Sequence, residues 1–286
     1  MISDMTLGQF FPGFSPIHKL DPRTKILLAI LFIVTIFLAD TPLSFLVLTV
    51  LTLLLIPISK ISARVIFRGI RPILLILLFT SVLNLFMTGG EGKPLVAFWV
   101  FRIYREGIIR AVLMSLRVVL LVIGTSLLLT YTTSPISLTD GLDSLLSPLN
   151  LLHVPVQVFS MMMTIALRFI PTLVEETEKI MNAQKSRGAD FTSGSLFRRA
   201  KALIPLLVPL FVSAFKRAEE LAVAMECRCY RVGGKRTKMV KLTLRARDFL
   251  WMFLGVLVLG AVIVLRIYAG RTEVDAGVWR ILLFRI

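Results

Sequence analysis

Long apolar blocks, separated by short polar or basic segments, constrain the fold of this 286-residue chain more than any other feature. A helix needs roughly 20 mostly apolar residues to cross a bilayer, and residues 108–133 and 249–267 have about that length. Hydrophobic residues make up 56% of the chain, whereas soluble proteins contain about 45–50%. The sequence therefore predicts an all-α integral membrane protein.

Five of the apolar blocks are expected to span the membrane. Lys and Arg are enriched in cytoplasmic loops, so the basic loop 59–71 and the basic region 134–247 are expected on the cytoplasmic side. The N-terminus would then also be cytoplasmic, and loop 88–107 would be outside. The five predicted spans are residues 26–39, 43–58, 72–87, 108–133 and 249–267.

Two further apolar stretches, 155–170 and 202–215, are short for a membrane crossing. Each continues without a turn signal into a charged helical stretch, and Pro171, Pro205 and Pro209 are expected to kink the two helices. This pattern favours two long helices that leave the membrane interface and project their tips into the cytosol. The alternative is two genuine spans, with residues 171–201 outside.

The chain is expected to divide by charge and hydropathy. The region 134–247 holds 17 Lys and Arg against nine Asp and Glu, half of the total net charge of +16. Its first part, 137–152, predicts a short amphipathic helix on the membrane surface, capped by Ser137, Thr139 or Asp140. The predicted parts are transmembrane helices 1–4 (1–133), a cytoplasmic or interfacial module (134–247), a last transmembrane helix (248–268) and a tail of unclear role (269–286).

One polar pattern occurs twice, 41 residues apart, where the two long helical stretches end. The copies are Glu178-x4-Ala183-x3-Arg187-Gly188 and Glu219-x4-Ala224-x3-Arg228-Cys229. Within each copy alanine and arginine are four residues apart and share one helix face. An arginine beside a smooth surface suits a partner groove lined by carbonyls or carboxylates. The alternative is that each arginine merely complements the helix dipole.

Several segments together are similar to one known family. They are residues 15–25 (Ser-Pro-Ile-His-Lys-Leu-Asp-Pro-Arg-Thr-Lys), 166–171 (Ala-Leu-Arg-Phe-Ile-Pro), 183–188 (Ala-Gln-Lys-Ser-Arg-Gly) and 224–230 (Ala-Met-Glu-Cys-Arg-Cys-Tyr). With them the chain resembles the transmembrane T subunit of energy-coupling factor transporters, a family that includes the cobalt-transport permease subunit. Family members commonly carry Ala-Arg-Gly in both coupling motifs, so Cys229 stands where the family has glycine.

The resemblance implies a non-enzymatic scaffold with three coupling helices, two of them long, kinked and crossing. Each tip would dock into one of two cytosolic ABC ATPase subunits, and an apolar platform would carry a small membrane-embedded substrate-binding subunit for a vitamin or a metal ion. The expected docking residues are Ala183, Ser186, Arg187, Gly188, Ala224, Cys227, Arg228 and Cys229. The expected platform residues are Leu142, Leu145, Leu149, Met161, Met162, Met163, Leu206 and Leu210.

The chain's own residues favour the same non-enzymatic role in a cell membrane, with no cofactor, no bound metal and no nucleic acid. Residues 233–237 depart from the Walker pattern, so another chain must hydrolyse ATP. A membrane enzyme would need clustered ionisable groups, yet the candidates within the predicted spans, Asn84, Arg110 and Arg117, are accompanied by no acid in those spans. The remaining alternatives are a dedicated cobalt or nickel permease subunit and a stand-alone secondary transporter.

Overall fold

The computed structural model describes residues 10–11, 13–87, 96–98, 101–189, 191, 195–231 and 242–271. Apart from one short hairpin, the described elements are helices, which confirms the all-α fold class. The chain forms two compact units. We call residues 9–141 with 242–286 the bundle unit, and residues 142–241 the two-helix unit.

The bundle unit contains most of the helices, and α6 begins in it and ends in the two-helix unit. A short hairpin of two three-residue strands pairs Val96 with Ile103 and Phe98 with Phe101 in antiparallel register. The bundle elements are α1 (Pro22–Leu38), α2 (Pro42–Ser59), α3 (Ala63–Ile70), η1 (Arg71–Ile73), α4 (Leu74–Met87), β1 (Val96–Phe98), β2 (Phe101–Ile103), α5 (Arg105–Thr125), the π-helical turn η2 (Ser126–Thr130), α6 (Pro135–Leu146) and α9 (Ala246–Arg271). The two-helix unit contains η3 (Ser147–Leu152), α7 (Val156–Ser186) and α8 (Leu196–Cys227).

Local sequence signals explain where several helices begin. Asp21 caps α1 by accepting a hydrogen bond from the Arg23 amide at 2.9 Å, and Pro22 occupies the first helical turn. Thr41 caps α2 in the same way. The predicted cap of the short helix was wrong, because Ser134 accepts from the Ser137 amide at 3.2 Å and α6 begins earlier than expected.

The basic segment between the second and third predicted spans is helical, which corrects the predicted loop 59–71. It forms α3, whose Ile66 is buried while Arg64 and Arg68 are exposed. A helix of eight residues gives too short an amphipathic pattern to be distinguished from a loop by sequence. Packing of Ile66 into the bundle core stabilises it in the folded chain.

Five helices of the described chain are long and apolar enough to cross a membrane, the number expected from sequence. The helices that meet this criterion are not the same five segments that the sequence predicts. The 17-residue α1 is shorter than the usual spanning length, whereas α7, which continues past the doubtful stretch 155–170, is long and apolar enough. The five are Pro42–Ser59, Ala63–Leu85, Gly107–Thr130, Val156–Ser186 and Ala246–Tyr268.

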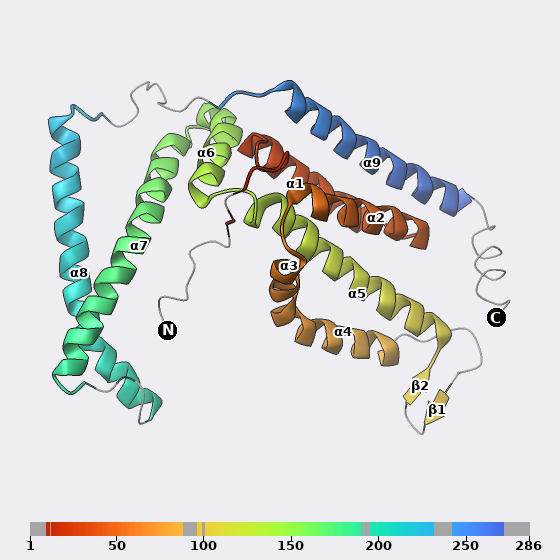
Figure 1. Ribbon diagram of the computed structural model, residues 1–286, viewed down its shortest axis with the longest axis horizontal. Coiled ribbons are helices and arrows are strands. Elements are labelled where there is room, and N and C mark those ends of the chain that lie inside the picture. Colours follow the sequence, from red (N-terminus) through yellow and green to blue (C-terminus); the bar gives the residue numbers. More distant parts are fainter. Residues whose placement is uncertain are drawn as a thin grey trace. The chain divides into compact units, whose positions relative to one another are not determined.

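Helix α1 lies at the centre of the bundle unit and packs against α5, α9 and η2 (Figure 1). Its Phe32 ring fills the space above Gly124 of α5, and any side chain at position 124 would overlap that ring. Gly255 likewise allows α9 to approach Leu28. Small residues at helix contacts are typical of membrane proteins, because they let backbones come close enough for dispersion contacts.

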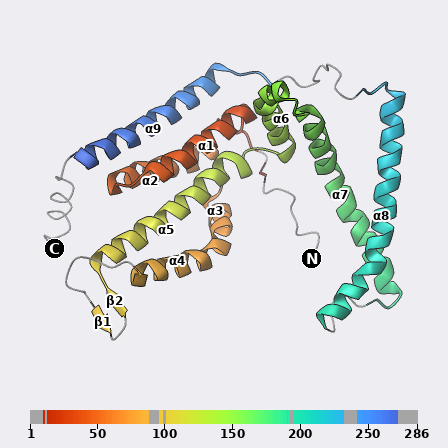
Figure 2. The ribbon, with the colours of Figure 1, turned by 180° about the vertical axis from the view of Figure 1, so that it is seen from behind.

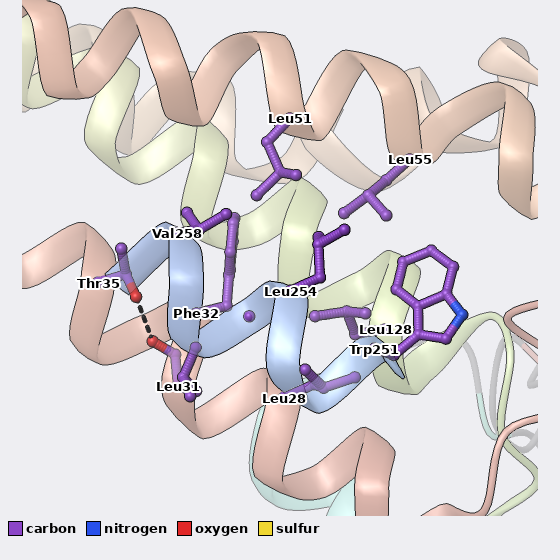
Figure 3. A pocket seen from close by; sticks show the side chains of 11 residues that line it. Leu28, Leu31, Phe32, Thr35, Leu51, Leu55, Leu128, Trp251, Leu254 and Val258 are labelled. Carbon is purple, nitrogen blue, oxygen red and sulfur yellow. Dashed lines mark hydrogen bonds between the residues drawn. The ribbon is translucent and has the colours of Figure 1, made fainter. Parts of the chain in front are cut away.

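A small apolar pocket remains between α1, α2 and α9 (Figure 3). Its volume is about 40 Å³, and Phe32, Leu254 and Trp251 point into it. Pockets for small organic ligands usually measure about 300–1,000 Å³. This pocket therefore has no room for a vitamin-sized molecule.

The segment 15–25 leads into a buried polar junction at the start of α1. Lys25 is 2% exposed, and its Nζ donates to the backbone oxygens of Thr132 at 2.8 Å and His18 at 3.2 Å. Asp248 of α9 accepts from the amides of Asp21 at 2.9 Å and Arg245 at 2.7 Å. Because these bonds join α1, α9 and the end of η2, the junction fixes one end of the bundle.

Candidate docking tips on two long helices

The two-helix unit is dominated by α7 and α8, which have 31 and 32 residues. Pro171 lies inside α7, and Pro205 and Pro209 lie inside α8. Proline removes a helical hydrogen bond and favours a bend, and α8 changes direction along its length (Figures 1 and 2). Both helices form as continuous elements through the charged stretches expected from the sequence.

The first tip, residues 183–188, ends α7 in a Schellman motif. Arg187 is the C-cap residue, and Gly188 adopts φ +87°. The Gly188 amide donates to the Lys185 oxygen at 2.9 Å, and the Ala189 amide donates to the Gln184 oxygen at 3.0 Å. These two bonds satisfy carbonyls that the helix end would otherwise leave free.

The second tip, residues 224–229, repeats this geometry without glycine. Arg228 is the C-cap residue, and Cys229 adopts φ +55°. The Cys229 amide donates to the Glu226 oxygen at 2.8 Å, and the Tyr230 amide donates to the Met225 oxygen at 3.0 Å. The replacement of glycine therefore leaves the shape of the turn intact, although a left-handed non-glycine residue costs roughly 1 kcal/mol.

All eight predicted docking residues are exposed. Within the described chain, neither the Arg187 nor the Arg228 guanidinium forms an ion pair. Cys227 and Cys229 are free thiols. Each tip thus presents an unpaired cation beside a small residue, which leaves both guanidinium groups available to a carbonyl or carboxylate partner.

A polar cluster joins α7 to α8 well before the tips. The Ser213 hydroxyl donates to Glu176 Oε1 at 2.5 Å, and Arg217 Nη2 donates to Glu176 Oε2 at 2.9 Å. Glu176 precedes Arg187 by 11 residues, and Arg217 precedes Arg228 by the same number. The two helices therefore meet at equivalent positions of the 41-residue repeat. From this contact each helix continues for 11 residues, about 16 Å at 1.5 Å per residue, to its tip arginine. We call these two segments the arms.

Sequence reasoning missed this cluster. The signal that could have found it is the repeat itself, because extending the register back from Glu178 and Glu219 by two residues aligns Glu176 with Arg217. Opposite charges at equivalent positions indicate that the two copies can contact one another. The pairing with Ser213 has no such signal.

The predicted platform residues differ in exposure. Met162 is 54% exposed and Met163 is 42% exposed, whereas Leu206 is only 5% exposed and offers little surface to a partner. Exposed residues also include Leu142 and Leu149, and the half-buried ones are Leu145, Met161 and Leu210. No group of three or more His, Cys, Asp or Glu side chains that could hold a metal ion occurs among the described residues. The glycine-rich segment 233–237 lies outside them.

Comparison with known proteins agrees with the helical membrane architecture. A family model described as cobalt transport protein matches residues 13–239. The energy-coupling factor transporter transmembrane protein EcfT of Clostridium kluyveri is 51% identical over 271 residues, covering 95% of this chain and all of the relative. The proteins of the same name from Acidaminococcus fermentans and Bacillus subtilis are 51% and 47% identical, each covering 87% of this chain and 92% and 93% of their own lengths.

The fold and the comparisons together define a multi-pass, all-helical membrane component of a transporter. More narrowly, the chain belongs to the EcfT proteins, the transmembrane components of energy-coupling factor transporters within the cobalt transport protein family. The resemblance first found in residues 15–25 and in the two arginine motifs is confirmed.

Proposed function

We propose that this chain is a non-enzymatic scaffold that couples ATP hydrolysis by two bound ATPase subunits to movement of a substrate-capturing membrane partner. The observation that carries the proposal is the pair of exposed arginine tips with one turn geometry, Gly188 and Cys229 each adopting positive φ. Two tips of the same geometry suit two similar grooves. Their equal distance from the Glu176–Arg217 contact suits a partner that moves both arms together.

The docking role is tested by reversing the charge at each tip. We expect Arg187→Glu and Arg228→Glu each to reduce co-purification of the ATPases, and the double variant to abolish it together with substrate uptake, because the guanidinium would become a carboxylate facing the same acceptors. The matched control is Lys216→Glu, an exposed residue on α8 with the same charge change. Normal ATPase retention by the double variant would refute the docking role.

The proposal also places both tips and the N-terminus on the cytoplasmic side, supported by the basic residues of 134–247. The chain has two cysteines, and both lie exposed at the second tip. A membrane-impermeant maleimide is expected to label them in inverted vesicles and not in intact cells. Added ATPase subunits should protect the thiols, whereas labelling of intact cells would contradict the orientation.

The exposed Met162 and Met163, with the apolar faces of α7 and α8, support a docking platform for a small substrate-capturing membrane protein. Methionine side chains adapt to different partners because they are flexible and polarisable. Replacing both methionines with glutamate should release this partner while the ATPases stay bound. Loss of both partners would instead indicate a folding defect.

A dedicated cobalt or nickel permease subunit is the second candidate, favoured by the description of the matching family. The two functions differ in the partners that accompany the chain. Purification from native membranes followed by mass identification should recover ATPases with one or several capture proteins. A single metal-specific partner would favour the second candidate.

A further inference from the structure

A hollow of about 240 Å³ lies in the bundle unit where α1 ends, α2 begins and the first half of α5 passes. It is lined by two arginines, one carboxylate and apolar side chains, namely Arg110, Arg117, Asp40, Phe45, Leu113 and Met114. We call it the cationic hollow. It is formed by different residues from the tips and from the platform.

Arg117 is held in place at the wall of this hollow. Its Nη2 donates to the Ala39 oxygen at 2.6 Å and lies 3.6 Å from Asp40 Oδ1, and its guanidinium lies 5.3 Å from the centre of the Phe45 ring. Its buried Nε has no hydrogen-bond partner among the described residues. The Arg117 side chain is 18% exposed, so part of this fixed guanidinium stays accessible to an acceptor from a ligand.

Among the described side chains around the hollow, positive charge exceeds negative charge. Asp40 is shared between Arg117 and Arg266, whose Nη2 lies 3.0 Å from Asp40 Oδ2. Arg110 is exposed and has no ion-pair partner within the described chain. It lies seven residues, or two helical turns, before Arg117 and on the same face of α5. Asp40 was the acid that sequence spacing did not find, because it comes from another element.

The position of the hollow matches the boundary between headgroups and acyl chains. Arg110 is the fourth residue of the candidate span Gly107–Thr130, and Arg266 is two residues before the end of Ala246–Tyr268. Arginines near the ends of spans extend their guanidinium groups toward the interface. Two residues next in sequence to Phe45 and Leu113 are aliphatic and exposed, with Leu46 58% exposed and Val112 59% exposed.

We propose that the cationic hollow binds the phosphate of an anionic phospholipid, with Arg110 and Arg117 as donors. Arginine binds phosphate oxygens through paired charge-assisted hydrogen bonds. An acidic headgroup such as phosphatidylglycerol carries no cationic group, so the net charge of its phosphate would offset part of the excess positive charge of the hollow. The acyl chains would lie along the exposed aliphatic faces of α2 and α5. A protein partner is disfavoured because such an interface usually has a polar rim, whereas the exposed neighbours Leu43, Leu46 and Val112 are apolar.

Binding is tested on the full-length chain in mild detergent by native mass spectrometry during titration with phosphatidylglycerol. We expect Arg110→Gln to weaken the apparent affinity by about tenfold, the usual size of one lost charge-assisted hydrogen bond. The control is Arg64→Gln, an exposed arginine of α3 with the same charge change, which should bind as the parent does. Arg110 has no ion-pair partner to lose among the described residues, so the fold should be unaffected.

Further arms separate the possible ligands. Phosphatidylcholine tests the need for net negative charge, and inorganic phosphate tests whether a free anion competes. The proposal is overturned if both variants bind phosphatidylglycerol equally, if phosphatidylcholine binds as tightly, or if inorganic phosphate displaces the lipid at similar concentration. It is also overturned if Arg110→Gln keeps its lipids and instead loses a co-purifying membrane protein.

Discussion

The bundle unit and the two-helix unit both contain apolar helical segments, yet they bury them differently. In the bundle unit, Phe32, Ile36, Leu48 and their neighbours form a continuous core. Among the described residues of the two-helix unit, the buried ones are Asp143, Val156 and Leu206. The apolar surface that stays exposed on α7 and α8, which form no comparable core, indicates a surface for lipid or for partner proteins.

The difference shows that two requirements act on one sequence: packing within the chain in the bundle unit, and contact with other molecules in the two-helix unit. Substitutions in the bundle unit should lower stability whether or not partners are present, because they act on contacts within the chain. Substitutions on the exposed surfaces of the two-helix unit should act mainly on partner retention or transport, whereas those at its helix ends should change only local stability. The following substitutions test that division, from the largest expected effect to the smallest.

Asp248→Ala should destabilise the bundle unit by about 3–5 kcal/mol, because it removes both hydrogen bonds of a buried carboxylate and one of the two carboxylates that offset the buried Lys25 charge. Thermal unfolding in detergent, followed by size-exclusion chromatography, measures the loss. Asp248→Asn retains an acceptor oxygen and should lose less. If Ala and Asn behave like the parent chain, the junction does not stabilise this unit.

Gly124→Ala should cost about 1–3 kcal/mol, because the new methyl group would overlap the Phe32 ring between α5 and α1. The matched control is Gly260→Ala in α9, where nothing lies within 4 Å. That control should be neutral or stabilise by about 0.5–1 kcal/mol, since alanine favours helix more than glycine does. Equal melting temperatures for the two variants would show that close α1–α5 packing is unimportant.

Glu176→Arg should reduce uptake severalfold while both ATPases stay bound, because it places two cations at the contact between α7 and α8. The charge-swapped double variant, Glu176→Arg with Arg217→Glu, should recover most of the uptake. Uptake assays in proteoliposomes and ATPase retention measure the two effects separately. Failure of the swap to restore uptake would show that this ion pair does not link the two arms.

Cys229→Gly should stabilise the end of α8 by about 1 kcal/mol, because glycine adopts positive φ without strain. The converse change, Gly188→Ala, should destabilise the end of α7 by a similar amount. Hydrogen exchange of the amides at positions 188–189 and 229–230 reports both effects. ATPase retention should be unchanged by Cys229→Gly, because both turns already share one geometry.

Residues close in sequence supplied most of what could be predicted about the candidate site. The membrane class and the two arginine tips depend on local sequence pattern. Helices α7 and α8 end at Arg187 and Arg228 as the sequence predicts, and the described chain contains helices long and apolar enough to span a membrane. The sequence was less successful with marginal elements. The short helix α3 depends on burial of Ile66, and the cap of α6 is Ser134, which precedes all three of the expected caps.

By itself the sequence determined the helical membrane class, the family and the two arginine tips, because hydropathy, turn residues and spacing act over a few residues. Tertiary structure alone decided which distant groups meet. It brought Asp248 to the start of α1, Asp40 to Arg117, and Glu176 to Arg217. Electrostatic and packing energies fall off over a few ångströms of space, and separation along the chain does not reveal that distance.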